Sequence, residues 1–198
     1  LELAHLNSFE SDFIEWIEKC NDFCNSLVDR IVTGMPDDKI RNEIQNELGY
    51  EDDLLIVSEI YSLWAIEGDE KIKNILSFAQ ADKGVAIEPD IDLHRELKLR
   101  LLNGTHTFTC GMVFLAGYDT VQQTMEDPLT SSFISDLMQY EIAPSIPYKI
   151  NENIKQAFIS TVLDRFRNPH INHHWKNITF QYSSKMRMRC IPLIMNYY

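Results

Sequence analysis

The chain of 198 residues is long enough for one sizeable core, or for one domain plus a piece of another, and its 44% hydrophobic and 24% charged residues are typical of a globular protein. Its net charge of −12 argues against nucleic-acid binding, which depends on neutralising phosphates with Lys and Arg. No apolar run approaches the roughly 18–20 residues needed to span a bilayer, so we expect no membrane partner.

The four cysteines, Cys20, Cys24, Cys110 and Cys190, are sparse for a chain of this length. Secreted disulfide scaffolds are much denser in cysteine, so this usage favours free thiols in a reducing compartment. The first residues show neither the basic nor the apolar region of a secretory signal. We therefore expect a cytoplasmic protein.

The first 90 residues mix helical and strand patterns. Apolar residues at helical spacing predict a helix over 11–22, and the β-branched segment 23–34 favours strands. A proline, early acids and a final glycine predict a helix within 35–49. The apolar segment 54–68 and the connection 77–90 are predicted to contain short strands.

Three helices are predicted after residue 91, over 93–116, 127–146 and 151–169. In the first, Gly104 and Gly111 lower the expected regularity. The second is expected to be capped near Thr130 and Ser131 and to stop before Pro144. The C-terminal segment gives no clear pattern. The fold class is therefore mainly α, with a few short β-strands near its start.

Three polar residues, Lys98, Asn103 and His106, interrupt the apolar background of the longest predicted helix. At 100° per residue they share an arc of about 140° with aliphatic neighbours. A desolvated lysine has a lowered pKa and can act as a general base near neutral pH. An asparagine amide can stabilise a developing oxyanion, and a histidine can orient a hydroxyl. Together they suit carbonyl reduction and alcohol oxidation by hydride transfer, without a metal.

A structural alternative explains the same residues without catalysis. The Lys98 side chain could extend to solvent, Asn103 and Gly104 could mark a helix break, and His106 could be a hydrogen-bonded core histidine. Spacing alone does not decide between the two interpretations.

Charge is unevenly distributed along the chain. Residues 161–198 contain six Lys or Arg and a single acid, Asp164. This segment is either a basic face that packs on the acidic part of the chain or a local site for a small anionic ligand.

The segment "KLRLLNGTH" is similar to the Lys-x4-Asn-x2-His signature of the mannitol dehydrogenase family, the polyol-specific long-chain dehydrogenases. Lys98, Asn103 and His106 match it residue for residue. The resemblance implies a helical C-terminal dehydrogenase domain in which Lys98 is the general acid/base, Asn103 stabilises the alkoxide and His106 holds the substrate.

Two further segments carry the resemblance. "NSLVDRI" resembles a family segment that implies substrate-facing positions for Val28 and Asp29. "RFRNP" resembles the family's Arg-Phe-x-Asn-Pro motif, and Lys185 falls where the family has a substrate-contacting lysine.

Two departures point to one branch of the family. Asn177 stands where polyol-oxidising members have an arginine, and His173 stands where they commonly have an acid. The pattern is most similar to the tagaturonate reductase (altronate oxidoreductase) branch, with fructuronate reductase and mannitol dehydrogenase as alternatives. The implied keto-uronate carries a carboxylate, for which Arg165, Arg167, Arg187 and Arg189 are candidate partners.

The resemblance implies NAD as cofactor, but the chain contains no Gly-x-Gly-x-x-Gly fingerprint. We therefore expect residues 1–34 to be the end of a cofactor domain or linker and 35–198 to be the substrate-binding and catalytic domain, truncated at both ends. Its expected partners are its own N-terminal cofactor domain and a small-molecule hexuronate or polyol. On its own the chain is expected to be inactive.

Two other classes of protein are alternatives. His170, His173 and His174 cluster, and Cys20 and Cys24 lie four residues apart, but nothing pairs the two groups into a zinc motif, so no metal is expected. A non-catalytic module that binds a protein partner through its acidic face is the second alternative.

Overall fold

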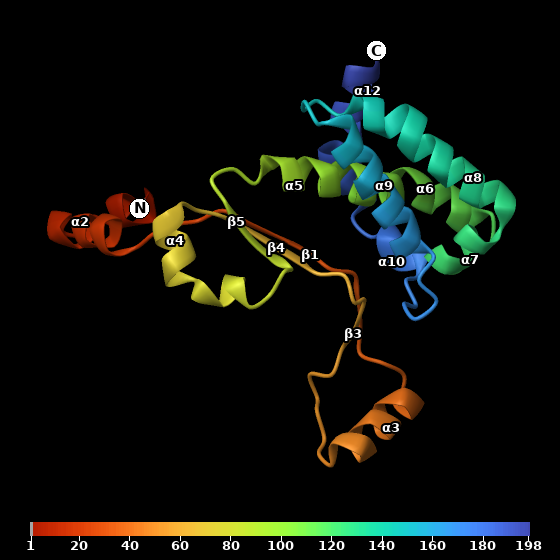
Figure 1. The fold of residues 1–198 in the computed structure, drawn as a ribbon, viewed down its shortest axis with the longest axis horizontal. Coiled ribbons are helices and arrows are strands. Elements are labelled where there is room, and N and C mark those ends of the chain that lie inside the picture. The colour runs from red at the N-terminus through yellow and green to blue at the C-terminus, as the bar shows by residue number, and fades with distance from the viewer. Residues whose placement is uncertain (1) are drawn as a thin grey trace. The chain divides into compact units, whose positions relative to one another are not determined.

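The computed structural model describes residues 2–198 and is mainly helical with a few short strands, which confirms the predicted fold class (Figure 1). The chain forms two compact units. The first unit comprises residues 1–28 and 63–91, and the second comprises residues 29–62 and 92–198.

The first unit contains a three-stranded sheet in the order β1-β4-β5. Strands β4 and β5 are parallel, with Trp64 opposite Val85. Ile66, Ile72 and Ile87 form its small apolar core. Its elements are α1 (Glu2–Leu6), α2 (Ser11–Cys20), β1 (Ser26–Asp29), β4 (Leu63–Glu67), α4 (Glu70–Ile75), the 3₁₀ turn η1 (Ser77–Gln80) and β5 (Val85–Glu88).

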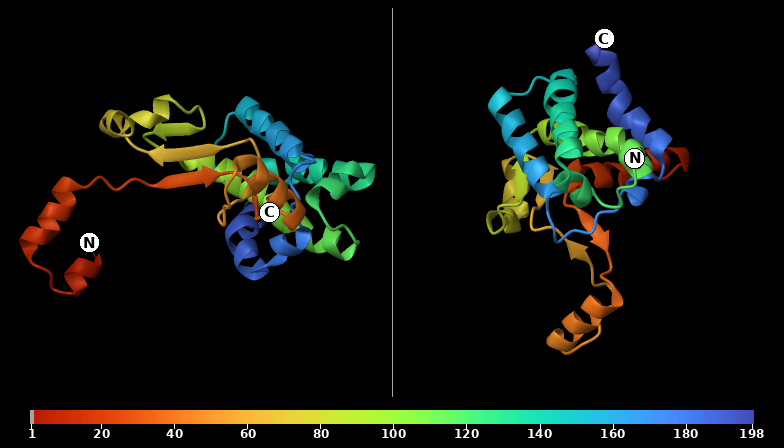
Figure 2. Two further views of the ribbon diagram at one scale, coloured as in Figure 1. Left: turned by 90° about the horizontal axis from the view of Figure 1, so that it is seen from below. Right: turned by 90° about the vertical axis from the view of Figure 1, so that its right-hand side faces the viewer.

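The second unit begins with an arm made of β2 (Val32–Gly34), α3 (Asp38–Leu48) and β3 (Val57–Ser58), which projects from the helices of this unit (Figure 2). Helix α3 confirms the prediction for 35–49. The Asp37 side chain caps it by accepting a bond from the Ile40 amide at 3.0 Å, and Gly49 ends it at φ 77°, a left-handed conformation that favours glycine.

The longest helical stretch runs through α5 (Asp92–Glu96), η2 (Leu97–Leu102) and α6 (Asn103–Leu115), which confirms the helix predicted over 93–116. It passes Gly104 without a break. Within η2 the hydrogen bonds are π-helical: the Asn103 amide donates to the Lys98 carbonyl, five residues back. A single π-helical stretch inside an α-helix frequently marks a functional site.

The remaining helices complete the second unit. The cap expected near Thr130 and Ser131 was wrong: Asp127 caps α8, and Pro128 occupies the first helical turn, where its missing N–H costs nothing. Pro144 lies inside a terminal 3₁₀ turn. The elements are α7 (Val121–Glu126), α8 (Pro128–Asp136), η3 (Leu137–Ile142), η4 (Ala143–Ser145), α9 (Glu152–Phe166), α10 (Trp175–Thr179), α11 (Tyr182–Lys185), η5 (Met186–Cys190) and α12 (Ile191–Tyr197).

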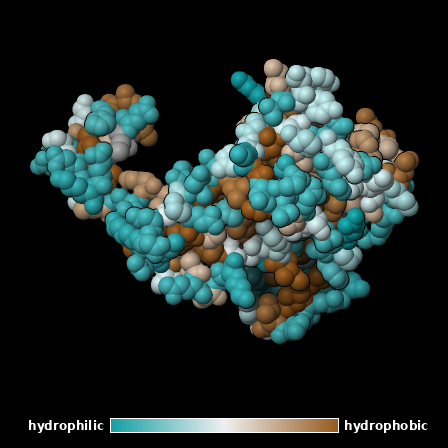
Figure 3. Space-filling model, turned by 45° about the horizontal axis from the view of Figure 1, so that its top comes forward, coloured by the Kyte–Doolittle hydropathy of each residue, from teal (hydrophilic) through white to brown (hydrophobic). Residues whose placement is uncertain are grey.

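These helices surround one apolar core in which Trp175 and Leu101 are fully buried. The Trp175 indole N–H donates to the Thr124 hydroxyl at 2.7 Å, so the largest core side chain has its polar atom satisfied. On the face shown in Figure 3, hydrophilic side chains alternate with apolar ones, and several large apolar side chains of the chain are exposed. Across residues 2–198, no helix has the length and apolar character required to cross a membrane.

Candidate active site

Lys98 and Asn103 lie at the start and just beyond the end of the π-helical stretch η2. The expectation from α-helical spacing placed them about 140° apart around the helix. The bond from the Asn103 amide to the Lys98 carbonyl instead spans five residues, which brings the two residues onto consecutive turns above one another. The π-helical stretch therefore aligns the first two members of the predicted triad more closely than an α-helix would.

His106 follows in α6 and is buried in an aromatic surround, with 4% of its surface exposed. Its ring stacks on Phe166 of α9 with centroids 4.3 Å apart. The rings of His173 and Trp175 meet it edge-on, at 5.0 and 5.7 Å. Helix α9 and the segment 173–175 therefore converge on this imidazole.

The side chains around His106 keep its ring neutral and leave one of its nitrogen atoms without a hydrogen-bond partner among the described residues. Burial lowers the pKa of His106 well below 6.5, and the nearby His173, Arg189, Arg165 and Lys185 act in the same direction. Its Nε2 atom is buried and makes no hydrogen bond to the described residues. A buried polar atom without a partner is rare, and at a site it is available to a ligand.

Lys98 is partly desolvated. Burial lowers the pKa of the Lys98 ammonium below 10.5, the Asp29 carboxylate opposes that shift, and the charges of Arg165 and Arg189 add to it. This is the direction that makes a lysine useful for proton transfer near neutral pH.

Asp29 and Arg165, both candidates for substrate contacts, are paired with each other. The Arg165 Nη1 and Nη2 atoms donate to the two Asp29 oxygens at 3.0 and 2.8 Å. The same guanidinium donates from Nε and Nη2 to Glu59, at 2.7 Å for the shortest contact. Asp29 is 1%, Glu59 3% and Arg165 7% exposed, so the network is almost fully desolvated.

The network ties the base of the arm to α9. Glu59 also accepts the Ile31 amide at 2.6 Å, and the Arg165 guanidinium lies 4.2 Å over the ring of Tyr61. Burial alone would lower the pKa of Arg165, but its bonds to Asp29 and Glu59 raise it above the ordinary value. Arg165 is therefore a permanent cation that already holds two carboxylates.

The other predicted cations differ in their surroundings. Lys185 donates to the Ile178 carbonyl at 2.8 Å, and its pKa is lowered by burial and by Arg189. Arg167 is exposed and pairs with Asp164 at 3.3 Å. Arg189 donates from Nη1 to the Thr107 hydroxyl at 3.2 Å, while its buried Nε makes no hydrogen bond to the described residues.

Sequence reasoning missed the residues that surround these groups. Phe166 was visible only as part of the "RFRNP" motif, and Trp175 and Glu59 carried no signal because their partners are distant in the chain. Val28, a predicted substrate contact, lies on β1 and is 62% exposed. Its own unit is the first, whereas Asp29 belongs to the second.

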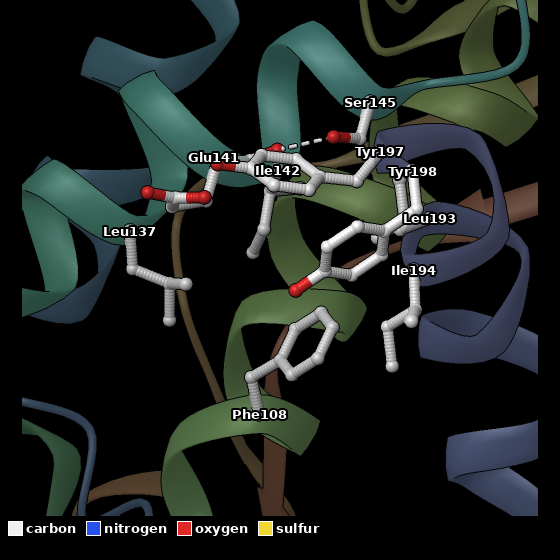
Figure 4. Close-up of a pocket in the computed structure, with 9 residues that line it drawn as sticks. All are labelled: Phe108, Leu137, Glu141, Ile142, Ser145, Leu193, Ile194, Tyr197 and Tyr198. Carbon is white, nitrogen blue, oxygen red and sulfur yellow. Dashed lines mark hydrogen bonds between the residues drawn. The ribbon is translucent and has the colours of Figure 1, made fainter.

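A separate groove of about 440 Å³ lies between α6, η3 and α12 (Figure 4). The rings of Phe108, Tyr197 and Tyr198 and the Ile194 side chain line it, and Glu141 is its one acid. The groove contains no member of the predicted triad, and its apolar walls do not suit a charged sugar acid.

Metal ligands do not cluster in the described part of the chain. Within residues 2–198, no three His, Cys, Asp or Glu side chains converge as a metal site would require. His173 instead presents its ring to His106.

Comparison with known families places this geometry in context. The model of the mannitol dehydrogenase C-terminal domain matches residues 90–197, and that of the mannitol dehydrogenase Rossmann domain matches residues 2–78. The first match covers more than half of the chain, and it contains Lys98, Asn103 and His106. The chain belongs to the mannitol dehydrogenase family.

Individual relatives are similar over nearly the whole chain. Altronate oxidoreductase from Bacillus subtilis is 42% identical over 197 residues, and the enzyme of the same name from Halalkalibacterium halodurans is 40% identical over 190 residues. These matches cover 100% and 96% of this chain but only 40% and 36% of the relatives.

A solved structure supports the same assignment. The ternary complex of Pseudomonas fluorescens mannitol 2-dehydrogenase with NAD and D-mannitol superposes with a TM-score of 0.73 at 27% identity. The superposition covers 98% of this chain and 38% of that one. A D-sorbitol dehydrogenase, at 22% identity and a TM-score of 0.76, shares the fold.

Proposed function

We propose that the protein to which this chain belongs interconverts tagaturonate and altronate, with NAD as hydride carrier and Lys98 as general acid/base. One observation carries the proposal: a partly desolvated Lys98 shares a continuous helix with a buried, neutral His106 whose Nε2 is unpartnered. Identity of 42% to an altronate oxidoreductase supports the choice of substrate.

The roles follow from the chemistry of each group. Bound NADH would supply the hydride for the carbonyl carbon. Lys98 Nζ donates its proton to the carbonyl oxygen during reduction, so that C=O becomes CH–OH. The reverse step returns the proton to neutral Lys98. Asn103 supplies an amide donor to the developing alkoxide. His106, held neutral, orients a substrate hydroxyl through Nε2.

Other contacts are assigned by the family resemblance. Asp29 and Val28 on β1 and Lys185 on α11 are proposed to face the substrate. For Asp29, the bonds to Arg165 fix the carboxylate in place and leave its charge near Lys98. We propose that Arg165 acts mainly by positioning Asp29.

The described residues contain a parallel strand pair, β4–β5, but no glycine-rich turn that could cradle a pyrophosphate. The dinucleotide phosphates are therefore proposed to bind outside residues 2–198. We expect no measurable NADH affinity for this chain in calorimetry, and tight binding would contradict that placement. The expected boundary between cofactor and substrate regions at 34/35 remains a prediction.

The test is NADH consumption by the full-length protein with tagaturonate, fructuronate and fructose in parallel. We expect a clear preference for tagaturonate, and a loss of at least about 10²-fold in the Lys98→Ala variant. Lys176→Ala, an exposed lysine on α10, is the matched control and should retain full activity.

The outcomes separate the alternatives. Preference for fructuronate or fructose would keep the Lys98 chemistry and replace the substrate by that of fructuronate reductase or mannitol dehydrogenase. Full activity in Lys98→Ala would refute the acid/base role. Absence of any reduction would favour a non-catalytic acidic binding module.

A further inference from the structure

The proposed substrate carries a carboxylate, and four arginines in the basic C-terminal segment are candidates to bind it. Arg165 uses all three guanidinium nitrogens on Asp29 and Glu59. Arg167 is exposed and paired with Asp164, and Arg187 is exposed. Only Arg189 combines partial burial with a buried N–H that makes no bond among residues 2–198.

Arg189 is held in place by its neighbours. Its Nη1 donates to the Thr107 hydroxyl at 3.2 Å, and that hydroxyl donates to the Asn103 carbonyl at 2.8 Å. The buried guanidinium of Arg100 donates to the backbone carbonyls of Met188 and Arg189. The π-helical turn η5 that carries Arg189 is thus fixed to η2, the turn that carries Lys98.

The local field favours an anion. Arg189 contacts Thr107, the residue after His106, and its backbone carbonyl accepts from Arg100 of η2. Its charge lowers the pKa of Lys98, His106 and Lys185. Burial lowers the pKa of Arg189 itself, yet a guanidinium stays protonated at physiological pH. Arg189, Lys98 and Lys185 carry like charges in a partly desolvated region, and a carboxylate that binds beside them stabilises these charges.

We propose that Arg189 binds the substrate carboxylate through its buried Nε–H, and so gives the site its preference for a sugar acid over a neutral ketose. This inference rests on the proposed function and adds the group that recognises the substrate class. An arginine fork matches carboxylate geometry, and a charge-assisted bond in a desolvated site is strong.

The test compares tagaturonate with tagatose, which has a hydroxymethyl group in place of the carboxylate, in the full-length protein. Arg189→Gln should lower kcat/KM for tagaturonate by about 10²-fold or more, and for tagatose by less than about 5-fold. Arg189→Lys keeps the charge without the fork and should lose about 10-fold. Arg187→Gln, two residues away and exposed, is the control and should change neither value.

A second readout guards against misfolding. Calorimetry should show that Arg189→Gln binds altronate more weakly than the unchanged protein. In steady-state kinetics, the KM of the variant for NADH should be unchanged. Thr107→Val removes the oxygen that holds Nη1 and should weaken altronate binding in the same direction. Equal losses for tagaturonate and tagatose, or unchanged altronate affinity in Arg189→Gln, would overturn the inference while leaving the proposed function intact. A wild-type preference for neutral ketoses would overturn both.

Discussion

The imidazole of His106 stacks on the ring of Phe166, with centroids 4.3 Å apart and planes inclined by 13°. The two residues come from helices α6 and α9, and both are almost fully buried. The stack fixes the plane of the imidazole, and edge contacts from His173 and Trp175 fix its rotation. Aromatic packing therefore orients a ring whose Nε2 remains available.

This relationship predicts the effect of Phe166→Leu. The substitution keeps an apolar side chain but removes the stacking surface, so the imidazole loses its fixed plane. We expect a fall of about 10-fold in kcat/KM for the ketone substrate, since small misplacements of a binding group are costly. Ile134→Val removes a methylene from the same core, far along the chain, at about 0.5–1.5 kcal/mol. It should leave kcat/KM unchanged, and an equal fall in both variants would contradict the role of the stack.

Acid should destabilise the second unit through His173. Burial lowers the pKa of His173 from 6.5 to about 4. Between these values the unfolded chain binds more protons than the folded one, so the free energy of unfolding falls as the pH falls below 6.5. Between pH 7 and pH 5 this loss amounts to about 2 kcal/mol.

Urea denaturation at the two pH values measures the difference. His173→Gln should lose about 2 kcal/mol less on acidification than His170→Gln, because the His170 side chain is exposed. Identical pH dependence in the two variants would show that His173 does not titrate in this range.

The buried network around Arg165 predicts that the protein loses much of its stability when the Arg165 charge is removed. Arg165→Met leaves the carboxylates of Asp29 and Glu59 buried without a counter-charge, which should cost about 3–5 kcal/mol in the free energy of unfolding. Adding Asp29→Asn and Glu59→Gln to this variant should recover much of that loss, because the buried charges are then gone. Failure of the triple variant to recover would show that shape, rather than charge, dominates.

Local signals in the sequence were sufficient for the simplest elements. Helix α3 lies within the predicted range 35–49 and ends at the predicted glycine, because a cap and a left-handed glycine act on neighbouring backbone groups. The long helix through Lys98 was also predicted from its apolar spacing. Its π-helical stretch was not, because side-chain pattern does not say whether an amide bonds four or five residues back.

Long-range pairs could not be predicted. Arg165 was expected to be a candidate for a substrate carboxylate, but its partners lie 106 and 136 residues away in the chain. The number of charges in the segment does not show which arginine is already paired with carboxylates and which has an N–H without a partner. The distinction between Arg165 and Arg189 therefore required the fold.

Gly111 offers a test of helix regularity in α6. A methyl group built there meets no atom within 4 Å, so alanine fits without rearrangement. Because glycine in a helix interior is less favourable than alanine, Gly111→Ala should raise the free energy of unfolding by about 0.5–1 kcal/mol. Gly49→Ala should instead lower the free energy of unfolding, because a residue with a side chain is strained at φ 77°. Destabilisation by Gly111→Ala would contradict the open space around this residue.

The pH profile of the proposed activity in the full-length protein should report the Asp29–Lys98 interaction. In the proposed reduction Lys98 is the general acid and must be protonated, so kcat/KM for reduction should fall as pH rises through its pKa, and the value for oxidation should rise. The Asp29 charge raises the pKa of Lys98, so in Asp29→Asn the fall for reduction and the rise for oxidation should both occur at lower pH. Glu59→Gln removes a charge from the same Arg165 network without this effect on Lys98, and its pH profile should not shift. An equal shift of the pH profile in both variants would assign the pH dependence to the network as a whole rather than to Lys98.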